Sequence, residues 1–464
     1  MIKLCLSSQT PPINPLPGAP HHPDGIWRLG EDYVPQFGGV VPMMRALLAE
    51  GAGNWIAPNP RWVALRGPGI PPEVRTSEGY VVETVQLNPS ERELYSRFKE
   101  SVWSSFHGPG ASRLLPDEYR AFVGYSYTAA RPLLEHLGEY DLYYINDFQQ
   151  ILTGMLLGSA APSLLRWHIP MDFRGYPEPV RRFFLKMMEG YDAIVVSTRQ
   201  GLEDLIRVGF LGRAYQVYPY LNPDEYRAPP PGAVRRFREK YGLDASPFVF
   251  SISRMDPVKR QDVLLKAFAL VCRRFPDHRL VLAGGGSFST QALGHGRRAT
   301  KAATWSAYLQ KLVHDLHLED QVVFTGNLNT EELHAAYRAS TLFVHPAPWE
   351  GFGLVAVEAW LHGRPVIVTR GAGVSELVND GVNGYAVSSG SAPALAARMA
   401  QVLAHPEQGE RMGEAGALTA RQCSVRRAAP RLRRIFEHTI HLYRRSGLAP
   451  AGPRRMSHHR GPGL

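Results

Sequence analysis

The sequence predicts an α/β protein made of two doubly wound, Rossmann-like domains that face each other across a cleft. The chain has 464 residues, more than one hydrophobic core usually organises. Short apolar runs alternate with amphipathic stretches, as in repeated units of parallel strand and helix. A proline-rich segment at residues 222–232 interrupts this alternation and predicts a stiff connector between the two halves.

The expected strands follow the apolar runs. In the first half they are residues 1–6, 62–65, 80–87, 141–146, 163–170, 193–198 and 215–218. In the second half they are residues 248–254, 279–283, 321–325, 342–345 and 365–369. Helical patterns follow strands of the second half, at residues 261–275 and 330–339, so ligands are expected beyond the C-terminal ends of its strands.

These elements divide the chain into five parts. We expect a first domain at residues 1–225, a hinge at 226–245, a second domain at 246–420, a C-terminal helix at 421–445 and a disordered basic tail at 446–464. A polar stretch at residues 287–307 is expected to be an insertion, and the sequence assigns it no role.

The composition indicates an ordinary globular protein, with 44% hydrophobic and 20% charged residues. No apolar run reaches the roughly 18 residues of a spanning helix, and the N-terminus lacks the long apolar core of a secretion signal. Three isolated cysteines, Cys5, Cys272 and Cys423, favour the cytoplasm. The net charge of +10 raises the hypothesis of nucleic-acid binding. Because many arginines lie near the C-terminus, a solvated helix face and a basic tail explain them better, and no nucleic-acid partner is expected.

The motif with the clearest chemical meaning is residues 348–360 (PWEGFGLVAVEAW), directly after the strand expected at 342–345. Two glycines precede an apolar helical run, so the first amide N–H groups of the helix can approach an anion closely. Glu350 and Glu358 would be about 10 Å apart if most of that span is helical, which suits two hydroxyl-bearing rings on either side of a diphosphate. The alternative is that Glu350 caps the helix and Glu358 is solvated, but the apolar neighbours of Glu358 disfavour it.

A second motif, residues 253–261 (SRMDPVKRQ), places Arg254 and Lys259 at the end of the strand expected at 248–254. Two fixed cations there could stabilise a leaving diphosphate without a metal. Alone, such a pattern is as often a surface ion pair. Beside the motif with two glutamates it becomes more specific.

Residues 248–403 resemble the nucleotide-sugar domain of the retaining glycosyltransferases of the GT-B fold, the large family that includes sucrose and glycogen synthases. The matching segments are Arg254 with Lys259, 283–286 (AGGG), 324–327 (FTGN), Glu350 with Glu358, 371–377 (GAGVSEL) and 383–385 (NGY). The resemblance implies that Glu350 faces hydroxyls of the donor sugar and that Glu358 contacts the ribose. It further implies that Arg254, Lys259, Gly353 and Leu354 lie around the phosphates.

Three segments of the first half point to sugar or phosphate binding, each with a structural alternative. Residues 36–48 (QFGGVVPMMRALL) open a helix with a glycine pair, which a tight turn explains equally well. The aromatic residues of 93–107 (ELYSRFKESVWSSFH) suit a sugar face, although a helical aromatic stripe is more often core. Asp147 and His168 follow strands, where ligands gather, and a core role is equally compatible with His168.

In combination these segments resemble the trehalose-6-phosphate synthases and their relatives, including the glucosylglycerol-phosphate synthases. The resemblance implies that Gly39 lies on the donor side, that His168 acts at the donor sugar, and that Tyr95, Trp103 and Asp147 line the sugar cleft. One departure concerns the acceptor. The arginine that grips its phosphate in that family has no counterpart in residues 6–10 (LSSQT). A phosphate-free acceptor, as in the glycosyltransferring trehalose synthases, therefore stays open.

Together these observations predict a retaining hexosyltransferase that moves a glucosyl unit from UDP-, GDP- or ADP-glucose to a sugar or sugar phosphate, forming trehalose or its phosphate. The resemblance implies front-side attack, with Arg254, Lys259, Glu350 and His168 as the catalytic group. No Asp-x-Asp signature or His/Cys cluster is visible, so neither metal nor cofactor is expected. A homo-oligomer is compatible with the sequence.

Three alternatives stay open. Glucosylglycerol-type or other hexosyl transfer would use the same donor site. A nucleotide-sugar epimerase would share the diphosphate site but would need carboxylates for acid–base chemistry. A non-catalytic nucleotide-sugar-binding protein is the third, because fold does not fix function.

Overall fold

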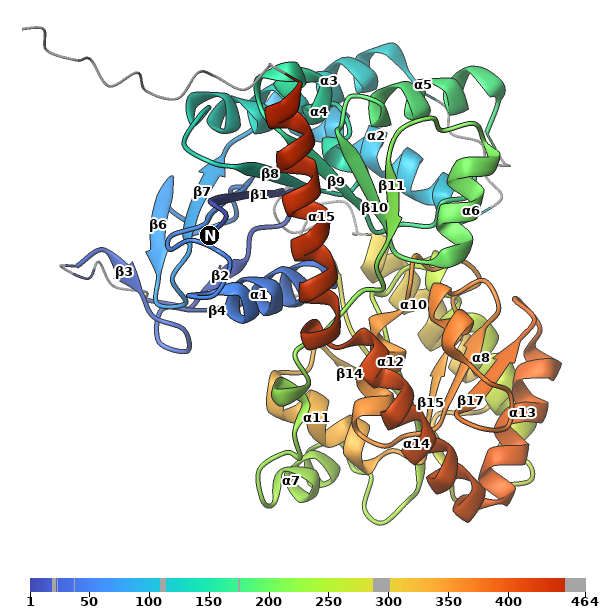
Figure 1. Cartoon of the computed structure of the whole chain (residues 1–464). Helices are drawn as coiled ribbons and strands as arrows, with labels where there is room; N and C mark the ends of the chain where they lie inside the picture. Colours follow the sequence, from blue (N-terminus) through green and yellow to red (C-terminus); the bar gives the residue numbers. More distant parts are fainter. Residues whose placement is uncertain are drawn as a thin grey trace, which may run out of the picture.

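The computed structural model describes residues 1–18, 22, 24–36, 38–108, 114–173, 176–286 and 301–446. The chain forms two α/β domains, each built around a mainly parallel sheet with helices on both faces (Figure 1). This arrangement confirms the predicted fold class. The buried, nearly continuous apolar strands at the centre of each sheet explain it, because such strands need helices on both sides.

Among the described residues, the sheet of the first domain has nine strands in the order β11-β10-β9-β8-β1-β5-β7-β6-β3. They are β1 (Leu4–Ser8), β3 (Ile26–Trp27), β5 (Arg61–Leu65), β6 (Glu73–Thr76), β7 (Val81–Val85), β8 (Leu142–Asn146), β9 (Ser163–Trp167), β10 (Ala193–Val196) and β11 (Ala214–Gln216). Within the part of the chain that the structure describes, β6 and β7 are the one antiparallel pair of this sheet. A separate antiparallel pair joins β2 (Ile13–Pro15) to β4 (Tyr33–Pro35).

Helices of the first domain pack on both faces of this sheet. They are α1 (Val40–Gly51), α2 (Pro89–Phe106), α3 (Pro116–Glu135), α4 (Thr153–Leu157), α5 (Glu178–Met188) and α6 (Arg199–Arg207), with the 3-10 turns η1 (Phe148–Gln150) and η2 (Gly158–Ala160). One core cluster joins α2, α3 and α5 to one face of the sheet, and another joins α1 to the other face.

The sheet of the second domain has six parallel strands within the described residues, in the order β14-β13-β12-β15-β16-β17. They are β12 (Phe248–Ile252), β13 (Arg279–Ala283), β14 (Val322–Gly326), β15 (Leu342–His345), β16 (Val366–Thr369) and β17 (Gly384–Val387). Side chains of β12 alternate between the two cores, with Phe248 and Phe250 on one side and Val249 on the other.

The helices of the second domain separate into the same two layers. They are α7 (Ala233–Lys240), α8 (Gln261–Val271), α10 (Lys301–Asp315), α11 (Thr330–Ala339), α12 (Leu354–Leu361), α13 (Ala392–Ala404) and α14 (Pro406–Ala420), with the 3-10 turns η3 (Pro223–Tyr226), η4 (Pro257–Lys259), η5 (Gly373–Leu377) and η6 (Arg421–Cys423). The helices α7, α11 and α12 cover one face, and α8, α10 and α13 cover the other.

The C-terminal helix α15 (Val425–Arg445) returns to the first domain (Figure 1). Its apolar residues recur every three or four positions, and they join the core that α1 covers. Phe436 lies edge-on to Trp55, with ring centroids 5.9 Å apart, and it also contacts Tyr144. The two domains are therefore linked by two crossings of the chain, one before α7 and one after α14.

Several expected boundaries shift in the structure. The range 226–245, expected to be a hinge, contains α7, whose Ala233 and Phe237 are buried in the core of the second domain. Residues 301–307 of the expected insertion are the first half of α10, and residues 287–300 lie outside the described residues. Of the expected tail, only Ser446 is described. The short strands β2, β3, β4, β6 and β17 were not expected.

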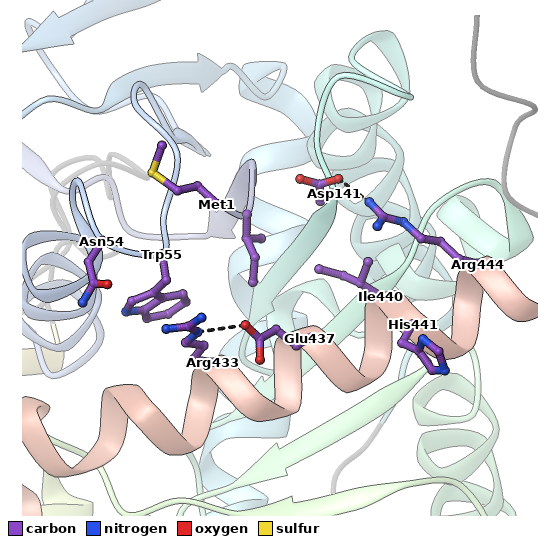
Figure 2. Close-up of a pocket in the computed structure, with 10 residues that line it drawn as sticks. Met1, Asn54, Trp55, Asp141, Arg433, Glu437, Ile440, His441 and Arg444 are labelled. Atoms are coloured by element: carbon purple, nitrogen blue, oxygen red, sulfur yellow. Dashed lines mark hydrogen bonds and ion pairs between the residues drawn. The ribbon is translucent and has the colours of Figure 1, made fainter. Parts of the chain in front are cut away.

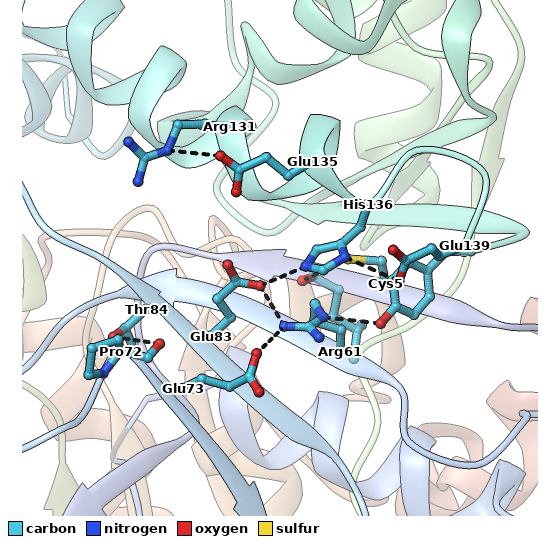
Figure 3. Close-up of polar contacts among 12 residues, drawn as sticks. Cys5, Arg61, Pro72, Glu73, Glu83, Thr84, Arg131, Glu135, His136 and Glu139 are labelled. Atoms are coloured by element: carbon cyan, nitrogen blue, oxygen red, sulfur yellow. Dashed lines mark hydrogen bonds and ion pairs between the residues drawn. The ribbon is translucent and has the colours of Figure 1, made fainter.

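A polar network joins strands of the first sheet to the end of α3 (Figure 3). Arg61 Nη1 lies 2.6 Å from Glu83 Oε2 and 2.8 Å from Glu73 Oε2. His136 lies 3.3 Å from Glu83 and 3.1 Å from Glu139. The network contains none of the predicted site residues, and its contacts tie β5 to β6, β7 and the helix, which indicates a structural role.

Candidate active site

Two helix N-termini converge where the domains meet. Helix α12 begins at Leu354, and its N-cap Gly353 has φ 98° and ψ 58°, which glycine adopts without strain. The N-cap of α1 is Gly39, and a Cβ atom there would lie 3.8 Å from Leu354 Cδ1. Neither helix has an acidic side chain in its first turn. Uncovered amide N–H groups and two helix dipoles therefore favour an anion at this point.

An ion pair of the second domain joins Lys259, at the end of η4, to Glu350, in the loop between β15 and α12. Lys259 Nζ donates to Glu350 Oε2, and His345 Nε2 lies 3.4 Å from the same oxygen. Burial acts to raise the pKa of Glu350, but the charge of Lys259 and the contact with His345 outweigh it and hold that pKa well below the usual range. Glu350 is therefore a carboxylate that can accept hydrogen bonds from sugar hydroxyls.

The side chain of Arg254 reaches across to the first domain. Its guanidinium lies over the ring of Trp103 on α2, with 4.6 Å between Cζ and the ring centroid. The ring of Trp103 in turn stacks on His107, with centroids 3.8 Å apart and an angle of 26° between planes. Within the described residues, Arg254 forms no ion pair, so its charge is available to an anionic ligand.

Further charges surround this contact between the domains. Lys301 on α10 lies 3.0 Å from Asp256 and 3.6 Å from Glu100 of α2, which makes the second pair an ion pair between domains. Lys99 is buried, and its ammonium lies 3.0 Å from Glu100. Burial lowers the pKa of Lys99, and the neighbouring charge of Arg254 adds to this effect, while Glu100 opposes it.

Asp147 and His168 lie together at the C-terminal ends of β8 and β9. Asp147 has φ 69°, an uncommon value for a residue with a side chain, and its Oδ1 lies 3.4 Å from the amide nitrogen of His168. Burial raises the pKa of Asp147 to about 7, although backbone N–H groups of Phe148, His168 and Ile169 act in the opposite direction. Asp147 can therefore exist in both protonation states near neutral pH.

The imidazole of His168 is held as a neutral ring. Asn146 Nδ2 donates to the carbonyl oxygens of Ser7 and Tyr144, so its Oδ1 faces His168 Nε2 at 3.0 Å. His168 Nε2–H is then the donor, and Nδ1 keeps its lone pair. Burial lowers the pKa of His168 well below the usual value, and the charge of Arg166 adds to this. His168 can orient a sugar, but it carries no positive charge of its own.

Glu358 is occupied by two tyrosines. Tyr337 Oη donates to Glu358 Oε2 at 2.8 Å, and Tyr226 Oη donates to Oε1 at 3.3 Å. Burial raises the pKa of Glu358 despite these two hydrogen bonds. Glu358 and Leu354 lie one turn apart on the half-buried face of α12. A ribose at this position would have to share the Glu358 carboxylate with Tyr226 or displace the Tyr226 hydroxyl from it.

Tyr95 differs from the expectation. It has no exposed surface and packs in the core of the first domain, with its ring centroid 4.3 Å from that of Tyr125. Tyr95 therefore offers no surface to a sugar in this conformation, and its predicted place in a sugar cleft stays a prediction. The aromatic residues of α2 thus lie on different faces of the helix. Tyr95 faces the core of the first domain, whereas Trp103 faces Arg254 of the second domain.

The two domains touch closely near His168. A Cβ atom on Gly351 would lie 1.8 Å from the carbonyl oxygen of His168, and one on Gly373 would lie 2.6 Å from Thr198 Cγ2. The carboxylate of Glu376, in η5, accepts hydrogen bonds from the amides of Arg199 and Gln200 at 3.0 and 2.8 Å. These amides are the first two of α6, so Glu376 of the second domain caps a helix of the first.

The comparisons with known proteins give the family. Residues 234–419 match the family described as Glycosyl transferases group 1. A D-inositol 3-phosphate glycosyltransferase from Streptomyces griseus subsp. griseus is 30% identical over 419 residues, which cover 82% of this chain and 81% of that protein. The chain belongs to the group 1 glycosyl transferases.

Two further similarities place this glycosyltransferase among known proteins. A GDP-mannose-dependent alpha-(1-6)-phosphatidylinositol monomannoside mannosyltransferase from Mycolicibacterium smegmatis is 34% identical over 205 residues, which cover 43% of this chain and 49% of that protein. The chain thus matches about half the length of that relative. A solved alpha,alpha-trehalose 6-phosphate synthase from Burkholderia multivorans superposes with a TM-score of 0.74 at 18% identity, covering 98% of this chain and 100% of that one. This confirms the GT-B fold.

The structure brings together most of the predicted site residues of this glycosyltransferase. At the contact between the domains lie Gly39, Trp103, His168, Arg254, Lys259, Glu350, Gly353 and Leu354, with Asp147 beside His168. Three residues around the site were not predicted. His107 ends the aromatic segment 93–107, and nothing in the sequence distinguished it from the core residues there. No local sequence pattern around Tyr226 or Glu376 indicates the contacts that they make.

A pocket of about 340 Å³ lies elsewhere on this glycosyltransferase, between the N-terminus and α15 (Figure 2). Its charged side chains pair with one another, Arg433 with Glu437 and Arg444 with Asp141. None of the predicted site residues lines it, so it is separate from the candidate active site. Within the described residues, no helix is long and apolar enough to cross a membrane, and no cluster of His, Cys, Asp or Glu is arranged to hold a metal ion.

Proposed function

We propose that this glycosyltransferase moves a hexosyl unit from a nucleoside diphosphate hexose to a hydroxyl of a polyol acceptor. The observation that carries the proposal is the approach of two helix N-termini, at Gly39 and Leu354. At the same contact between the domains, Arg254 lies over Trp103 and forms no ion pair within the described residues. A diphosphate is the substrate group that fits this positive environment. Arg254 and the amides of α12 would stabilise the charge that develops on the leaving diphosphate.

The donor hexose would lie between this anion site and the loops after β8 and β9. Glu350, held ionised by Lys259, would accept hydrogen bonds from its hydroxyls. Asp147 and the neutral His168 would orient it from the first domain. Glu358 would contact the ribose once Tyr226 gives way.

We further propose retention of configuration by front-side attack, in which the leaving diphosphate takes the acceptor proton. The surroundings of the two carboxylates support this. Glu350 pairs with Lys259 and Asp147 with backbone amides, and in this proposal both carboxylates bind the donor sugar, so no enzyme nucleophile is invoked. The paired arrangement of catalytic carboxylates used by retaining glycosidases is therefore not needed here. The reaction proceeds without a metal in this proposal.

The acceptor is a sugar or cyclic polyol. The trehalose-type resemblance of the first domain favours glucose or glucose 6-phosphate, and the name of the Streptomyces relative favours an inositol phosphate. For the donor, the trehalose-type resemblance favours a glucosyl unit, and the name of the Mycolicibacterium relative, which is dependent on GDP-mannose, favours a mannosyl unit. The three cysteines are free in the structure, which supports a reducing compartment such as the cytoplasm.

A matrix of donors and acceptors tests the proposal. The protein is incubated with UDP-, GDP- and ADP-glucose and with GDP-mannose, each alone and with glucose, glucose 6-phosphate, glycerol phosphate or inositol phosphate. Product that forms only with an acceptor supports transfer, and it should persist in EDTA and be lost in Glu350→Gln. A donor altered without acceptor would instead indicate an epimerase. Tight donor binding without turnover would indicate a non-catalytic binding protein.

A further inference from the structure

Two buried polar atoms at the C-terminal end of α2, one on the helix and one on its C-cap residue, have no hydrogen-bond partner among the described residues. They are Nε1 of Trp103 and Nε2 of His107. The two residues lie one helical turn apart, and their rings stack with centroids 3.8 Å apart. Because leaving a buried donor or acceptor unpaired costs free energy, such a pair indicates that a ligand supplies the missing partner in one state of the protein.

The hydrogen bonding of His107 fixes the chemistry of the pair. Nδ1 of His107 lies 2.9 Å from the carbonyl oxygen of Trp103, which can only accept, so Nδ1 carries the proton and Nε2 keeps its lone pair. Burial lowers the pKa of His107 to about 3, and the charge of Lys259 adds to this effect, so the ring stays neutral at working pH. Trp103 Nε1 thus offers one donor, and His107 Nε2 offers one acceptor.

The location of the pair links it to the candidate active site. The guanidinium of Arg254 lies over Trp103, and the charges of Lys259 and Glu350 act on His107. All three charged residues belong to the second domain. A ligand that reaches these two atoms would therefore lie between the domains and would enter when they separate.

We propose that Trp103 and His107 form a subsite for one sugar hydroxyl, which accepts from Trp103 Nε1 and donates to His107 Nε2. A hydroxyl is both donor and acceptor, whereas a phosphate or carboxylate oxygen would meet the His107 lone pair without a proton to share. The subsite thus selects a polyol and disfavours an anionic group at this position. The inference rests on the proposed function, because it takes the ligand to be the hexose or polyol of the transfer reaction.

Sugar binding tests the subsite without requiring turnover. The affinities of glucose, the four monodeoxyglucoses and inositol are measured by calorimetry in the presence of UDP or GDP, for wild type, Trp103→Phe, His107→Phe and the double variant. Each single change should weaken binding of the recognised sugar roughly tenfold, the effect of one hydrogen bond. The double variant should be about as weak as either single variant, because one hydroxyl bridges both atoms. One deoxy sugar should bind wild type and variants equally weakly.

Three further variants separate recognition from packing. His107→Gln can return an acceptor near the Nε2 position and should recover part of the affinity. If His107→Phe fails to fold, His107→Asn keeps a donor to the Trp103 carbonyl and removes only the acceptor. Tyr220→Phe removes a buried hydroxyl that has no partner in the described structure, outside the site, and should bind sugar as wild type does.

The outcomes distinguish this inference from the proposed function. Wild-type affinities in both single variants, or no sugar binding by wild type, would overturn the subsite. Loss of affinity in the pattern above with no transfer from any donor would support the subsite and reject the proposed reaction. Active wild type with unchanged KM and kcat in Trp103→Phe and His107→Phe would reject the subsite alone.

Discussion

The ammonium group of Lys259 and the carboxylate of Glu350 form an ion pair between the loop after β12 and the loop before α12. Lys259 is buried, and the side chain of Glu350 is 17% exposed. Each loop follows one of two adjacent parallel strands, so the pair joins the two motifs that the sequence singled out. The pair therefore both holds the two loops together and keeps Glu350 ionised.

Lys259→Ala should remove transfer and destabilise the second domain. A buried carboxylate left without its cation costs about 3–5 kcal/mol, and the pKa of Glu350 should rise because its main stabilising charge is lost. The rate of transfer should fall by at least about a hundredfold. Urea unfolding and initial rates measure both effects. The control is Lys240→Ala, which removes an exposed ammonium group from its ion pair with Glu332 and should cost at most about 1 kcal/mol. Equal losses in the two variants would contradict the role given to Lys259.

Gly351→Ala should prevent the observed contact between the domains. The added Cβ would lie 1.8 Å from the carbonyl oxygen of His168, closer than any non-bonded contact allows. We expect a more open protein, measurable as a larger radius of gyration in X-ray scattering, and loss of transfer with each domain still folded. Gly124→Ala on α3 is the matched control, because its Cβ would meet nothing closer than 3.8 Å. A compact and active Gly351→Ala variant would show that this contact is not part of the working conformation.

The sequence was sufficient for the fold class because the central strands and the following helices are strongly patterned. The apolar runs at residues 142–146, 163–167 and 248–252 are strands on these grounds. Short edge strands such as β6 and β17 bury fewer side chains and leave a weaker pattern. The pattern of α15 identified a helix, but which domain it covers depends on the complementary face of α1 and on Trp55, far away in the sequence.

For the candidate site, the residues that follow strands could be predicted, because parallel strands bring their C-terminal ends to one edge. Arg254, Lys259, Asp147 and His168 are of this kind. Residues on helices could not be assigned in the same way. Tyr95 and Trp103 lie on one helix, and only the packed structure shows which faces the core and which faces Arg254.

Asp147→Asn should change how stability depends on pH. Because burial raises the folded-state pKa of Asp147 from 3.8 to about 7, its contribution to stability is complete below about pH 4 and is lost as the pH rises through 7. Asparagine does not ionise, so the Asp147→Asn variant does not lose stability in this way as the pH rises. Its stability relative to wild type should therefore increase between pH 4 and pH 8, by at most about 4 kcal/mol for a shift of about three units.

Urea unfolding of wild type and Asp147→Asn at intervals from pH 4 to pH 8 measures this difference. Asp244→Asn is a suitable control, because Asp244 also has a positive φ, 40°, but is exposed. Its stability difference should stay flat over the same range. A flat profile for Asp147→Asn as well would mean that the carboxyl group ionises freely in the folded protein.

Glu376→Ala should favour separation of the domains. The Glu376 carboxylate accepts hydrogen bonds from the backbone N–H groups of Arg199 and Gln200. Thr198 Oγ1 accepts a hydrogen bond from the third N–H group of α6, that of Gly201, at 2.9 Å. Removing a cap of this type costs about 0.5–2 kcal/mol, so the ratio of open to closed protein should rise by roughly 2- to 30-fold. Fluorescent labels on the two domains would report the shift as a longer mean distance, and KM for the donor should rise with it.

Two control variants check the role of the Glu376 carboxylate. Glu376→Gln keeps one acceptor oxygen, so its mean distance should lie between those of wild type and Glu376→Ala. Exposed Glu407 supplies the control variant Glu407→Ala, whose distances should match those of wild type. An unchanged distance distribution in Glu376→Ala would mean that the other contacts between the domains hold the closed form without it.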